Sequence, residues 1–393
     1  MGQWRKKMQR ARRLHRPFLK NWERDKLYEA FPSFVKSVSC STEEYRFLLL
    51  SENAPQQIPV VLDAKKLTTA EFNQDYEARE EPCVIQNIPY GYDGAKNTKE
   101  WGAVTKWSLQ ALEVSSLRKR AFKCGEDDDG KSVRVKLKHF LQYLYKNYDD
   151  SPLYVFDSTF DEDGSAKSLL ADYRVPSYFA DDLFRLVSEA RRPPYRWFLV
   201  GPERSGTCVH IDPLATSAWN TLIHGKKRWV LFPPHVPKRV VKGRGLVRSD
   251  EDDEAIHYFM NILPRIKRRA ESLRSHDDYR DFACYEFTQN AGETVYIPTG
   301  WHHAVLNLTH TVGVTQNFCS PRNFDQVWLK TRTGRKRMAW KWLCQLDKEY
   351  PHLAERARHL NERDNFRMKY DPGEIKRRET EERMRKMRRK NQV

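Results

Sequence analysis

The residues of this chain best suited to metal chemistry lie in two short stretches that are far apart in the sequence. In residues 207–213, Val209 and Ile211 alternate with His210 and Asp212, which is the pattern of a β-strand with one apolar face. Residues i and i+2 of a strand point to the same side, so His210 and Asp212 are expected to present an imidazole and a carboxylate together. Val209 and Ile211 are then expected to face an apolar layer. Such a pair alone is weak evidence for a metal, because polar strand faces often contain one by chance.

The second stretch, residues 292–308, reads as a strand, a Pro-Thr-Gly turn and a second strand that begins with His302 and His303. Neighbouring residues of a strand face opposite sides, so only one of these two histidines can join the first pair. Two histidines and one carboxylate, with three open positions, suit a non-haem Fe(II) oxygenase. Zinc more usually takes three histidines, or cysteines, with one open position. The two stretches together therefore predict an iron site.

The two stretches resemble the His-x-Asp…His iron motif of the jumonji-C family of 2-oxoglutarate oxygenases, and most of all its nuclear lysyl hydroxylases and arginine demethylases. The similarity covers roughly residues 15 to 350 and is carried by specific runs: 122–127, 151–154, 192–198, 204–207, 210–220 and 315–318. The spacing from the Pro-Thr-Gly-Trp turn in this family implies that His303 is the third iron ligand, with His210 and Asp212. The resemblance also implies Fe(II), 2-oxoglutarate and O₂ as the reacting cofactors and cosubstrates.

The resemblance further implies where 2-oxoglutarate binds. Lys227 matches the cation that pairs with the distal carboxylate, Thr315 matches a hydroxyl donor, and Asn220 and Tyr154 match positions that line the cofactor. Taken alone, Lys227 reads as a solvent-facing strand lysine. Its place between Asn220 and Thr315 in the matched pattern favours the cofactor role, because an ammonium is a suitable point-charge partner for a carboxylate.

Three further positions are expected near the reacting centre. Thr207 matches a substrate-side position of the family. Asn317 shares a strand face with Thr315 by the i, i+2 rule and is expected near the iron, and Trp197 is expected to line the pocket. The reaction implied by the resemblance couples decarboxylation of 2-oxoglutarate to hydroxylation of a substrate C–H bond. Hydroxylation of a lysine carbon stops there, whereas hydroxylation of an N-methyl group releases formaldehyde and so removes the methyl.

The elements that position these residues indicate a mainly β fold with flanking helices. Short strands separated by tight turns in residues 195–318 suit a double-stranded β-helix, the cupin-like jelly roll, followed by C-terminal helices. The chain is therefore expected to divide into five parts: a basic N-terminal arm (1–27), an α/β region that extends the core (28–163), the jumonji-C barrel (164–328) with a charged insertion (244–280), C-terminal helices (329–365) and a basic tail (366–393).

Local patterns predict several elements outside the barrel. Residues 59–62 and 83–88 read as strands that flank a helix over 69–79, and residues 152–156 read as a short strand that carries Tyr154. Residues 323–361 are predicted to be helical, with two apolar stripes at helix spacing, which usually pack on their own domain. These stripes consist of Met338, Ala339, Trp342, Leu343 and Leu346, and of Leu353, Ala354, Ala357 and Leu360.

Charge and cysteine content set the expected surroundings. The formal net charge is +17, which favours a polyanion or an acidic surface as a partner. Seven scattered cysteines without a C-x-x-C pattern indicate a reducing compartment, and no apolar run approaches the ~20 residues of a membrane span. The basic arm and the basic tail read as nuclear import signals or nucleic-acid contacts, or as solvated helices. We therefore expect a nuclear protein.

The expected partners follow from the resemblance and from charge. Basic protein substrates such as histone tails and Arg/Ser-rich splicing factors are implied by the family, as is a homodimer formed through the C-terminal helices. RNA is a further expected partner, and the acidic runs 126–129 and 250–253 are expected to receive a basic substrate. Two alternatives stay open: a non-catalytic chromatin or RNA adaptor, and a peripheral phosphatidylserine-binding factor in apoptotic cell clearance. The complete iron triad, together with Lys227 and Thr315, favours the enzyme.

Overall fold

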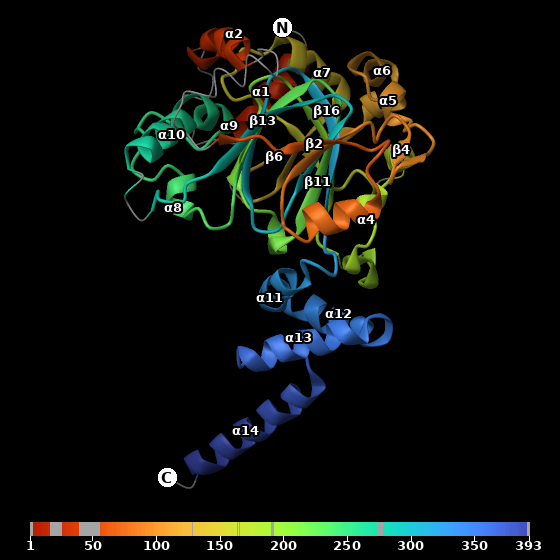
Figure 1. The fold of residues 1–393 in the computed structure, drawn as a ribbon, viewed down its shortest axis with the longest axis vertical. Helices are drawn as coiled ribbons and strands as arrows, with labels where there is room; N and C mark the ends of the chain where they lie inside the picture. The colour runs from red at the N-terminus through yellow and green to blue at the C-terminus, as the bar shows by residue number, and fades with distance from the viewer. Residues whose placement is uncertain are drawn as a thin grey trace.

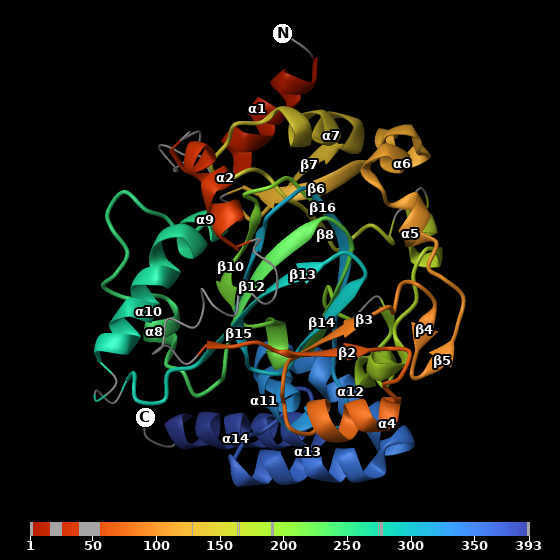
Figure 2. The same ribbon diagram turned by 45° about the horizontal axis from the view of Figure 1, so that its top comes forward.

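A computed structural model describes residues 3–15, 26–38, 56–127, 129–162, 164, 166–189, 192–273, 275 and 278–390. Within these residues, most strands belong to two large sheets, of five and seven strands, that enclose the centre of the molecule (Figure 1). Helices cover the outside of this barrel, and the helices at the C-terminal end form a separate layer beneath it (Figures 1 and 2). This arrangement confirms the predicted jelly roll with flanking and C-terminal helices.

The strands of the two sheets are assembled from distant parts of the chain. In the five-stranded sheet their order is β1 (Gln56–Gln57), β13 (Cys284–Asn290), β12 (Lys226–Phe232), β15 (His302–Asn307) and β10 (Gly206–His210). In the seven-stranded sheet their order is β2 (Val60–Asp63), β3 (Cys83–Gln86), β14 (Glu293–Ile297), β11 (Ser217–His224), β16 (Thr311–Phe318), β9 (Arg196–Gly201) and β8 (Val155–Asp157). Only the β1–β13 and β2–β3 pairs are parallel among the described strands.

Two small hairpins lie outside the large sheets. They are formed by β4 (Tyr92–Asp93) with β5 (Lys96–Asn97), and by β6 (Ala121–Glu126) with β7 (Ser132–Lys136). Around them lie α1 (Gln3–His15), α2 (Lys26–Val38), α4 (Thr69–Phe72), α5 (Ala103–Lys106), α6 (Leu109–Val114) and α7 (Leu137–Lys146). Between β12 and β13 the chain forms α8 (Lys238–Val241), α9 (Ala255–His257), a π-helical turn at Tyr258–Ile262 and α10 (Leu263–Ser272).

The C-terminal layer consists of α11 (Phe324–Gly334), α12 (Lys336–Glu349), α13 (Pro351–Arg363) and α14 (Pro372–Lys390). Both predicted apolar stripes of this region are buried against one another and against Leu183, Phe184 and Trp328. Burial of apolar side chains is the main source of stability, so the stripes attach this layer to the chain's own barrel. None of the described helices is long and apolar enough to cross a membrane.

Several local predictions are confirmed and some need correction. The two strands predicted near residues 60 and 85 are present as β2 and β3, but the helix between them continues only as a π-helical segment at Asn73–Glu77. The short strand β8 begins at Val155, so Tyr154 lies just before it rather than in it. The segment between β12 and β13 also contributes apolar side chains to a buried cluster against the five-stranded sheet.

Candidate metal centre

Three side chains converge at one end of the barrel. His210 is the last residue of β10, Asp212 follows that strand, and His303 lies near the start of β15. Strand pairing places His210 directly opposite His303, and their ring centroids are 4.3 Å apart. The Nε2 atom of His303 lies 3.9 Å from Oδ2 of Asp212. Among the described residues these three form a group whose ligand atoms all lie within 4.8 Å of one another, as metal ligands require.

A β-bulge, rather than a regular strand, brings the first two ligands into place. Thr207 pairs with Val305 and His210 with His303, so three steps along β10 oppose two steps along β15. A bulge of this kind re-aims the side chains that follow it. The prediction of an uninterrupted strand through Asp212 is therefore wrong, as is the predicted burial of Ile211, which is 38% exposed; Val209 is buried as expected. After Asp212 the chain enters a 3-10 turn at Pro213–Ala215.

Hydrogen bonds orient both imidazoles for metal binding. The Nδ1 atom of His210 lies 2.7 Å from the carbonyl oxygen of Cys208, and that of His303 lies 3.1 Å from the carbonyl oxygen of Trp301. A carbonyl oxygen only accepts, so each Nδ1 carries the proton and each Nε2 keeps a lone pair for a metal. Burial, with the nearby His210, lowers the pKa of His303 to about 4, which keeps this ring neutral at physiological pH.

The carboxylate completes a donor set that fits Fe(II). The Oδ2 atom of Asp212 is buried and has no hydrogen-bond partner within the described part of the chain. A buried carboxylate oxygen without a partner is costly unless a cation binds it. Two imidazoles and one carboxylate on one side of a cavity leave the opposite side open, which is the arrangement found in non-haem iron oxygenases.

The metal ligands open into a cavity of about 190 Å³ between the two sheets. This volume is below the ~300–1,000 Å³ of pockets for drug-sized ligands, so the cavity suits a small molecule. All the site residues predicted from the sequence line it: Tyr154, Trp197, Thr207, His210, Asp212, Asn220, Lys227, His303, Thr315 and Asn317. Sequence reasoning missed other lining residues, which are Phe156, Leu199, Pro213, Ala218, Trp229, Ile297 and Val305. Strand alternation singles out Trp229 on β12, but nothing in the sequence shows that this face lines a cavity.

The register of the five-stranded sheet separates a metal end from a cationic end. On β12, Lys227 lies opposite Asn307, Trp229 opposite Val305, and Leu231 opposite His303. Lys227 is therefore four strand residues from the level of His303, or ~13 Å of backbone at ~3.3 Å per residue. The side chains of Trp229 and Val305 lie between the two levels and form the apolar wall of the cavity.

Lys227 is a buried cation without a carboxylate partner among the described residues. Its side chain is 1% exposed, and its ammonium makes one long contact, 3.5 Å from Oδ1 of Asn220. Burial lowers the pKa of Lys227 to about 7, because the charged form loses its hydration. A ligand carboxylate would supply the missing partner. The structure thus places Lys227 where the anionic end of a small ligand can meet it.

The facing sheet supplies neutral polar groups. Asn220 lies opposite Thr315, and Thr315 lies opposite Trp197, so these residues form one row across β11, β16 and β9. The hydroxyl of Thr315 donates to the carbonyl oxygen of Trp219 at 2.8 Å. Exclusion of water raises the pKa of Tyr154, whose hydroxyl lies beside Asn307.

Thr207 and Asn317, the other polar residues expected near the reacting centre, also line the cavity. Thr207 is opposite Val305, and its hydroxyl is buried without a hydrogen-bond partner within the described residues. The amide of Asn317 donates to the hydroxyl of Thr216 at 3.0 Å, which fixes its orientation beside the turn after Asp212. His302, the neighbour of the third ligand, is buried but does not line the cavity, in keeping with strand alternation.

Comparisons with known proteins agree with this site. Residues 197–318 match the family described as "JmjC domain, hydroxylase". The bifunctional arginine demethylase and lysyl-hydroxylase psr-1 of Caenorhabditis elegans is 42% identical over 301 residues, which are 77% of this chain and 71% of that relative. The lysine-specific demethylase JMJ21 of Arabidopsis thaliana is 34% identical over 312 residues, 77% of this chain and 30% of that relative.

A more distant relative is named for its cofactors. The 2-oxoglutarate and iron-dependent oxygenase JMJD4 of Gallus gallus is 24% identical over 274 residues, 67% of this chain and 61% of that relative. The bound groups expected in such an enzyme match the metal end and the cationic end of the cavity. The barrel, the His-Asp-His triad and these similarities show that the chain belongs to the JmjC family of 2-oxoglutarate- and iron-dependent oxygenases.

Proposed function

We propose that this protein hydroxylates lysine side chains of basic nuclear proteins, such as histone tails and Arg/Ser-rich splicing factors, and demethylates methylarginine as a second activity. One observation carries the catalytic part of the proposal. A single cavity holds the His-Asp-His triad at one end and an unpaired buried lysine at the other. The lysine and arginine substrates are supported by the name of the psr-1 relative, which carries both activities.

The chain's own residues bind and orient the reactants. His210, Asp212 and His303 would hold Fe(II), which when bound supplies the oxidation of a substrate C–H bond coupled to decarboxylation of 2-oxoglutarate. Lys227 would pair with the distal carboxylate of 2-oxoglutarate, and Asn220 keeps the ammonium in place. The apolar wall between the two ends excludes water, which strengthens this ion pair.

The basic substrate needs an acidic surface, and two runs are candidates for it. In residues 126–129, Glu126 is paired with Lys123, and Asp129 with Lys131, while Asp128 lies outside the described residues. In run 250–253, Glu251 is likewise paired with Arg265, so ion pairing does not favour either run and both remain candidates for docking. Charge reversal by Asp250→Lys with Asp253→Lys is expected to raise the KM for a basic peptide, and an unchanged KM would argue against docking there.

The proposed setting is the nucleus, where the basic arm and tail act as import signals. The proposed assembly is a homodimer formed through the C-terminal helices. Because both apolar stripes of those helices are buried within the chain's own layer, such a dimer would use their outer faces. RNA is a further proposed partner, in line with the net charge of +17. The alternative of a non-catalytic adaptor is disfavoured, since an adaptor has no need of a complete ligand set.

The decisive experiment measures succinate formation and peptide mass together. The purified protein is incubated with Fe(II), 2-oxoglutarate, O₂ and an Arg/Ser/Lys-rich peptide. We expect the peptide to gain the mass of one oxygen atom, on a lysine located by fragmentation. A methylated arginine peptide is expected to lose the mass of one methylene group.

The matched control is the His210→Ala/Asp212→Ala variant, which removes two ligands of the triad. It is expected to form neither product while retaining the fold. If the wild-type protein binds iron but modifies no peptide of either kind, the adaptor becomes the better explanation and the proposal of a protein hydroxylase fails.

A further inference from the structure

The turn that follows the metal ligand Asp212 has a strained backbone. Leu214 adopts φ 59° and ψ 16°, and Ala215 adopts φ 55°, so two successive residues with side chains lie in the left-handed region. Residues other than glycine enter this region only as isolated exceptions, because the Cβ atom then lies too close to the following carbonyl oxygen. A turn of this kind persists only where contacts with the surrounding structure hold it.

An apolar contact holds the turn from one side. The side chain of Leu214 is half-buried and packs on the apolar cluster of the C-terminal layer. It meets that layer at the end of α11, where a Cβ atom added to Gly334 would lie 3.7 Å from Cδ2 of Leu214. Figure 1 shows α11 on the side of this layer that faces the barrel. The end of α11 therefore supports a residue that lies two positions after Asp212.

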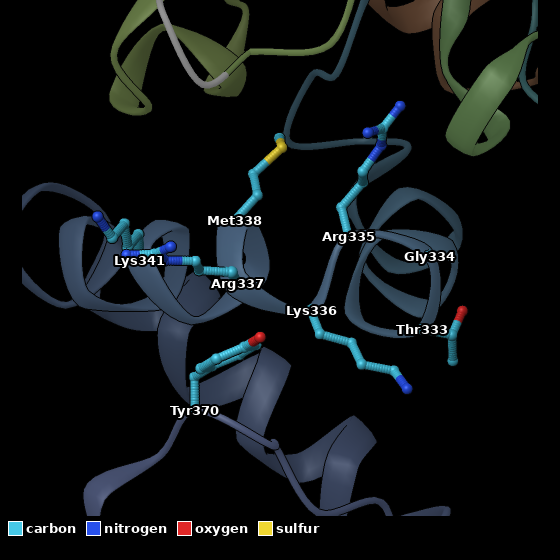
Figure 3. A pocket seen from close by; sticks show the side chains of 8 residues that line it. All are labelled: Thr333, Gly334, Arg335, Lys336, Arg337, Met338, Lys341 and Tyr370. Atoms are coloured by element: carbon cyan, nitrogen blue, oxygen red, sulfur yellow. The ribbon is translucent and has the colours of Figure 1, made fainter.

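The corner between α11 and α12 leaves room for this contact. Figure 3 shows Gly334 at the corner, with the side chains of Arg335 and Lys336 extending to opposite sides. These residues line a surface cavity of about 750 Å³. Gly334 itself presents only backbone, so Leu214 can approach the end of the helix closely.

Hydrogen bonds hold the same turn from another side. The hydroxyl of Thr299, which lies in the turn before the third ligand His303, donates to the carbonyl oxygen of Ala215 at 3.1 Å. A hydroxyl has one proton, so the oxygen of Thr299 accepts from the hydroxyl of Ser217, 3.2 Å away. The amide of Asn323, the residue before α11, donates to Ser217 at 2.9 Å. These buried side chains link the start of α11 to the turns beside both ligand-bearing segments.

We propose that Leu214 is a positioning residue of the metal centre and that α11, acting through the turn at Pro213–Ala215, sets the affinity for the metal. Asp212 stands at the start of this turn, and its carboxylate must keep its place beside the two imidazoles. Relaxation of the turn toward the ordinary right-handed region would change the direction of the chain at Asp212 and move the carboxylate out of the ligand group. The proposal concerns the metal centre alone and does not depend on which peptide the enzyme modifies.

The experiment measures the affinity of the full chain for Mn(II) by calorimetric titration in the absence of 2-oxoglutarate. The test variant is Leu214→Ala, which keeps a Cβ atom in the strained turn and shortens the side chain that packs on the C-terminal layer. The control is Leu186→Ala, because Leu186 is likewise half-buried on the same apolar cluster but lies in a different segment. Loss of a residue that orients a metal ligand weakens metal binding by about 10- to 100-fold. We expect Leu214→Ala to weaken Mn(II) binding by about tenfold and Leu186→Ala to leave it unchanged.

Replacement by glycine separates positioning from packing. Glycine adopts the left-handed region without steric cost, so in Leu214→Gly the turn needs less support from α11. We therefore expect Leu214→Gly to bind Mn(II) more tightly than Leu214→Ala, although it removes more of the side chain. A residue that serves only packing would give the opposite order, in Mn(II) affinity as in the midpoint of thermal unfolding of the metal-free protein.

A matched pair of variants tests the hydrogen bonds to the turn. Thr299→Val removes the hydroxyl that donates to Ala215 and keeps the shape of the side chain, whereas Thr299→Ser keeps the hydroxyl. Thr299→Val is expected to weaken Mn(II) binding by about fivefold, the effect of one lost hydrogen bond. Thr299→Ser is expected to bind Mn(II) as the wild-type protein does.

Several outcomes would overturn the proposal. One is an unchanged Mn(II) affinity in Leu214→Ala, and another is an equal loss in Leu214→Ala and Leu186→Ala, which would make metal binding a consequence of overall stability. If the Leu214 variants do not fold, equal Mn(II) affinities in Thr299→Val and Thr299→Ser would overturn it instead. A wild-type protein that binds no Mn(II) would overturn the metal centre together with the proposal, whereas the other outcomes leave the metal centre in place.

Discussion

Two neighbouring buried cations of β12, Lys227 and Arg228, differ in whether the chain itself supplies a carboxylate partner. Lys227 and Arg228 are both buried, at 1% and 7% exposure, and they face opposite sides of the same strand. Arg228 donates from Nε to Glu286 at 2.6 Å, and Lys267 pairs with the same carboxylate. The ammonium of Lys227 donates one hydrogen bond within the described residues, to the amide oxygen of Asn220 at 3.5 Å.

This difference indicates that the charge of Arg228 stabilises the fold, whereas the charge of Lys227 serves a ligand site. Burying a charge is costly unless it is paired and hydrogen-bonded. For Arg228 the chain itself supplies the partner, so the pair stabilises the outer face of the sheet. For Lys227 the described chain supplies only the amide oxygen of Asn220 and no carboxylate, so the cost is offset when an anionic ligand binds. An unpaired cation inside a small cavity is therefore a sign of a ligand site.

The largest expected effect comes from removing the unpaired cation. In Lys227→Met, kcat/KM for 2-oxoglutarate is expected to fall by ~10²-fold or more, because a buried ion pair with the ligand is lost. The free energy of unfolding of the ligand-free protein is expected to rise, because a buried unpaired charge has been removed. Succinate formation and urea unfolding measure the two effects. Lys226→Met, an exposed neighbour on the same strand, is the matched control and is expected to change neither.

Removing Arg228, the paired cation, is expected to lower the stability of the protein and to leave its affinity for 2-oxoglutarate unchanged. In Arg228→Met the protein should lose about 3 kcal/mol of stability, because the buried Glu286 loses the ion pair with Arg228. The affinity for 2-oxoglutarate should stay at the wild-type value. Urea unfolding checks the first statement and calorimetry the second. The double variant Arg228→Met/Glu286→Leu is expected to recover much of the stability; a further loss would contradict this account of the pair.

The comparison also predicts how the stability of the protein and its affinity for 2-oxoglutarate depend on pH. Burial lowers the pKa of Lys227 to about 7 in the ligand-free protein. Below that pH the buried ammonium lowers the free energy of unfolding. This cost decreases as the pH rises above 7 toward the pKa that Lys227 has in the unfolded protein. A carboxylate ligand binds the charged form. The affinity for 2-oxoglutarate is therefore expected to be flat below pH 7 and to fall by about tenfold per pH unit above it.

Calorimetric titration of the Mn(II)-loaded protein with 2-oxoglutarate between pH 6 and 9 measures this dependence. Lys227→Arg keeps its charge throughout this range, so its affinity, although weaker, should not fall with pH for this reason. If the affinity for 2-oxoglutarate falls equally with pH in the wild-type protein and in Lys227→Arg, a group other than Lys227 titrates. Lys227 is then charged at every pH tested.

Strand alternation and the family resemblance predicted much of this site from sequence. Alternation predicts that His302 and His303 face opposite sides of their strand, because adjacent residues of a strand point to opposite faces. The structure agrees, since His303 lines the cavity and His302 does not. It fails in residues 207–212, where the bulge between Thr207 and His210 inserts one residue and the strand ends before Asp212. The alternating pattern of these residues does not indicate a bulge, so the exposure of Ile211 could not be predicted from the sequence.

The parts that sequence missed depend on contacts between distant segments. Nothing in the sequence around Arg228 indicates its buried partner, because Glu286 is brought against it by the pairing of β12 with β13. Gly201 is the last residue of β9, and a Cβ atom there would lie 2.3 Å from the amide nitrogen of Asn307 and 2.8 Å from the ring of Tyr154. These relations arise from how β9, β12, β13 and β15 assemble. Local pattern, which covers a few residues at a time, does not contain them.

The smallest expected effect concerns Thr315, the hydroxyl that the resemblance assigns to the cofactor carboxylate. Its hydroxyl already donates to the carbonyl oxygen of Trp219 at 2.8 Å, so like Arg228 it is satisfied by the chain itself. Donating to 2-oxoglutarate would require the hydroxyl to turn away from that carbonyl, and the net gain is then about 1 kcal/mol. Thr315→Val is therefore expected to raise the KM for 2-oxoglutarate by only about fivefold, measured by succinate formation. A loss as large as that of Lys227→Met would show that the hydroxyl turns fully to the ligand, and that a group satisfied in the ligand-free chain can still belong to the site.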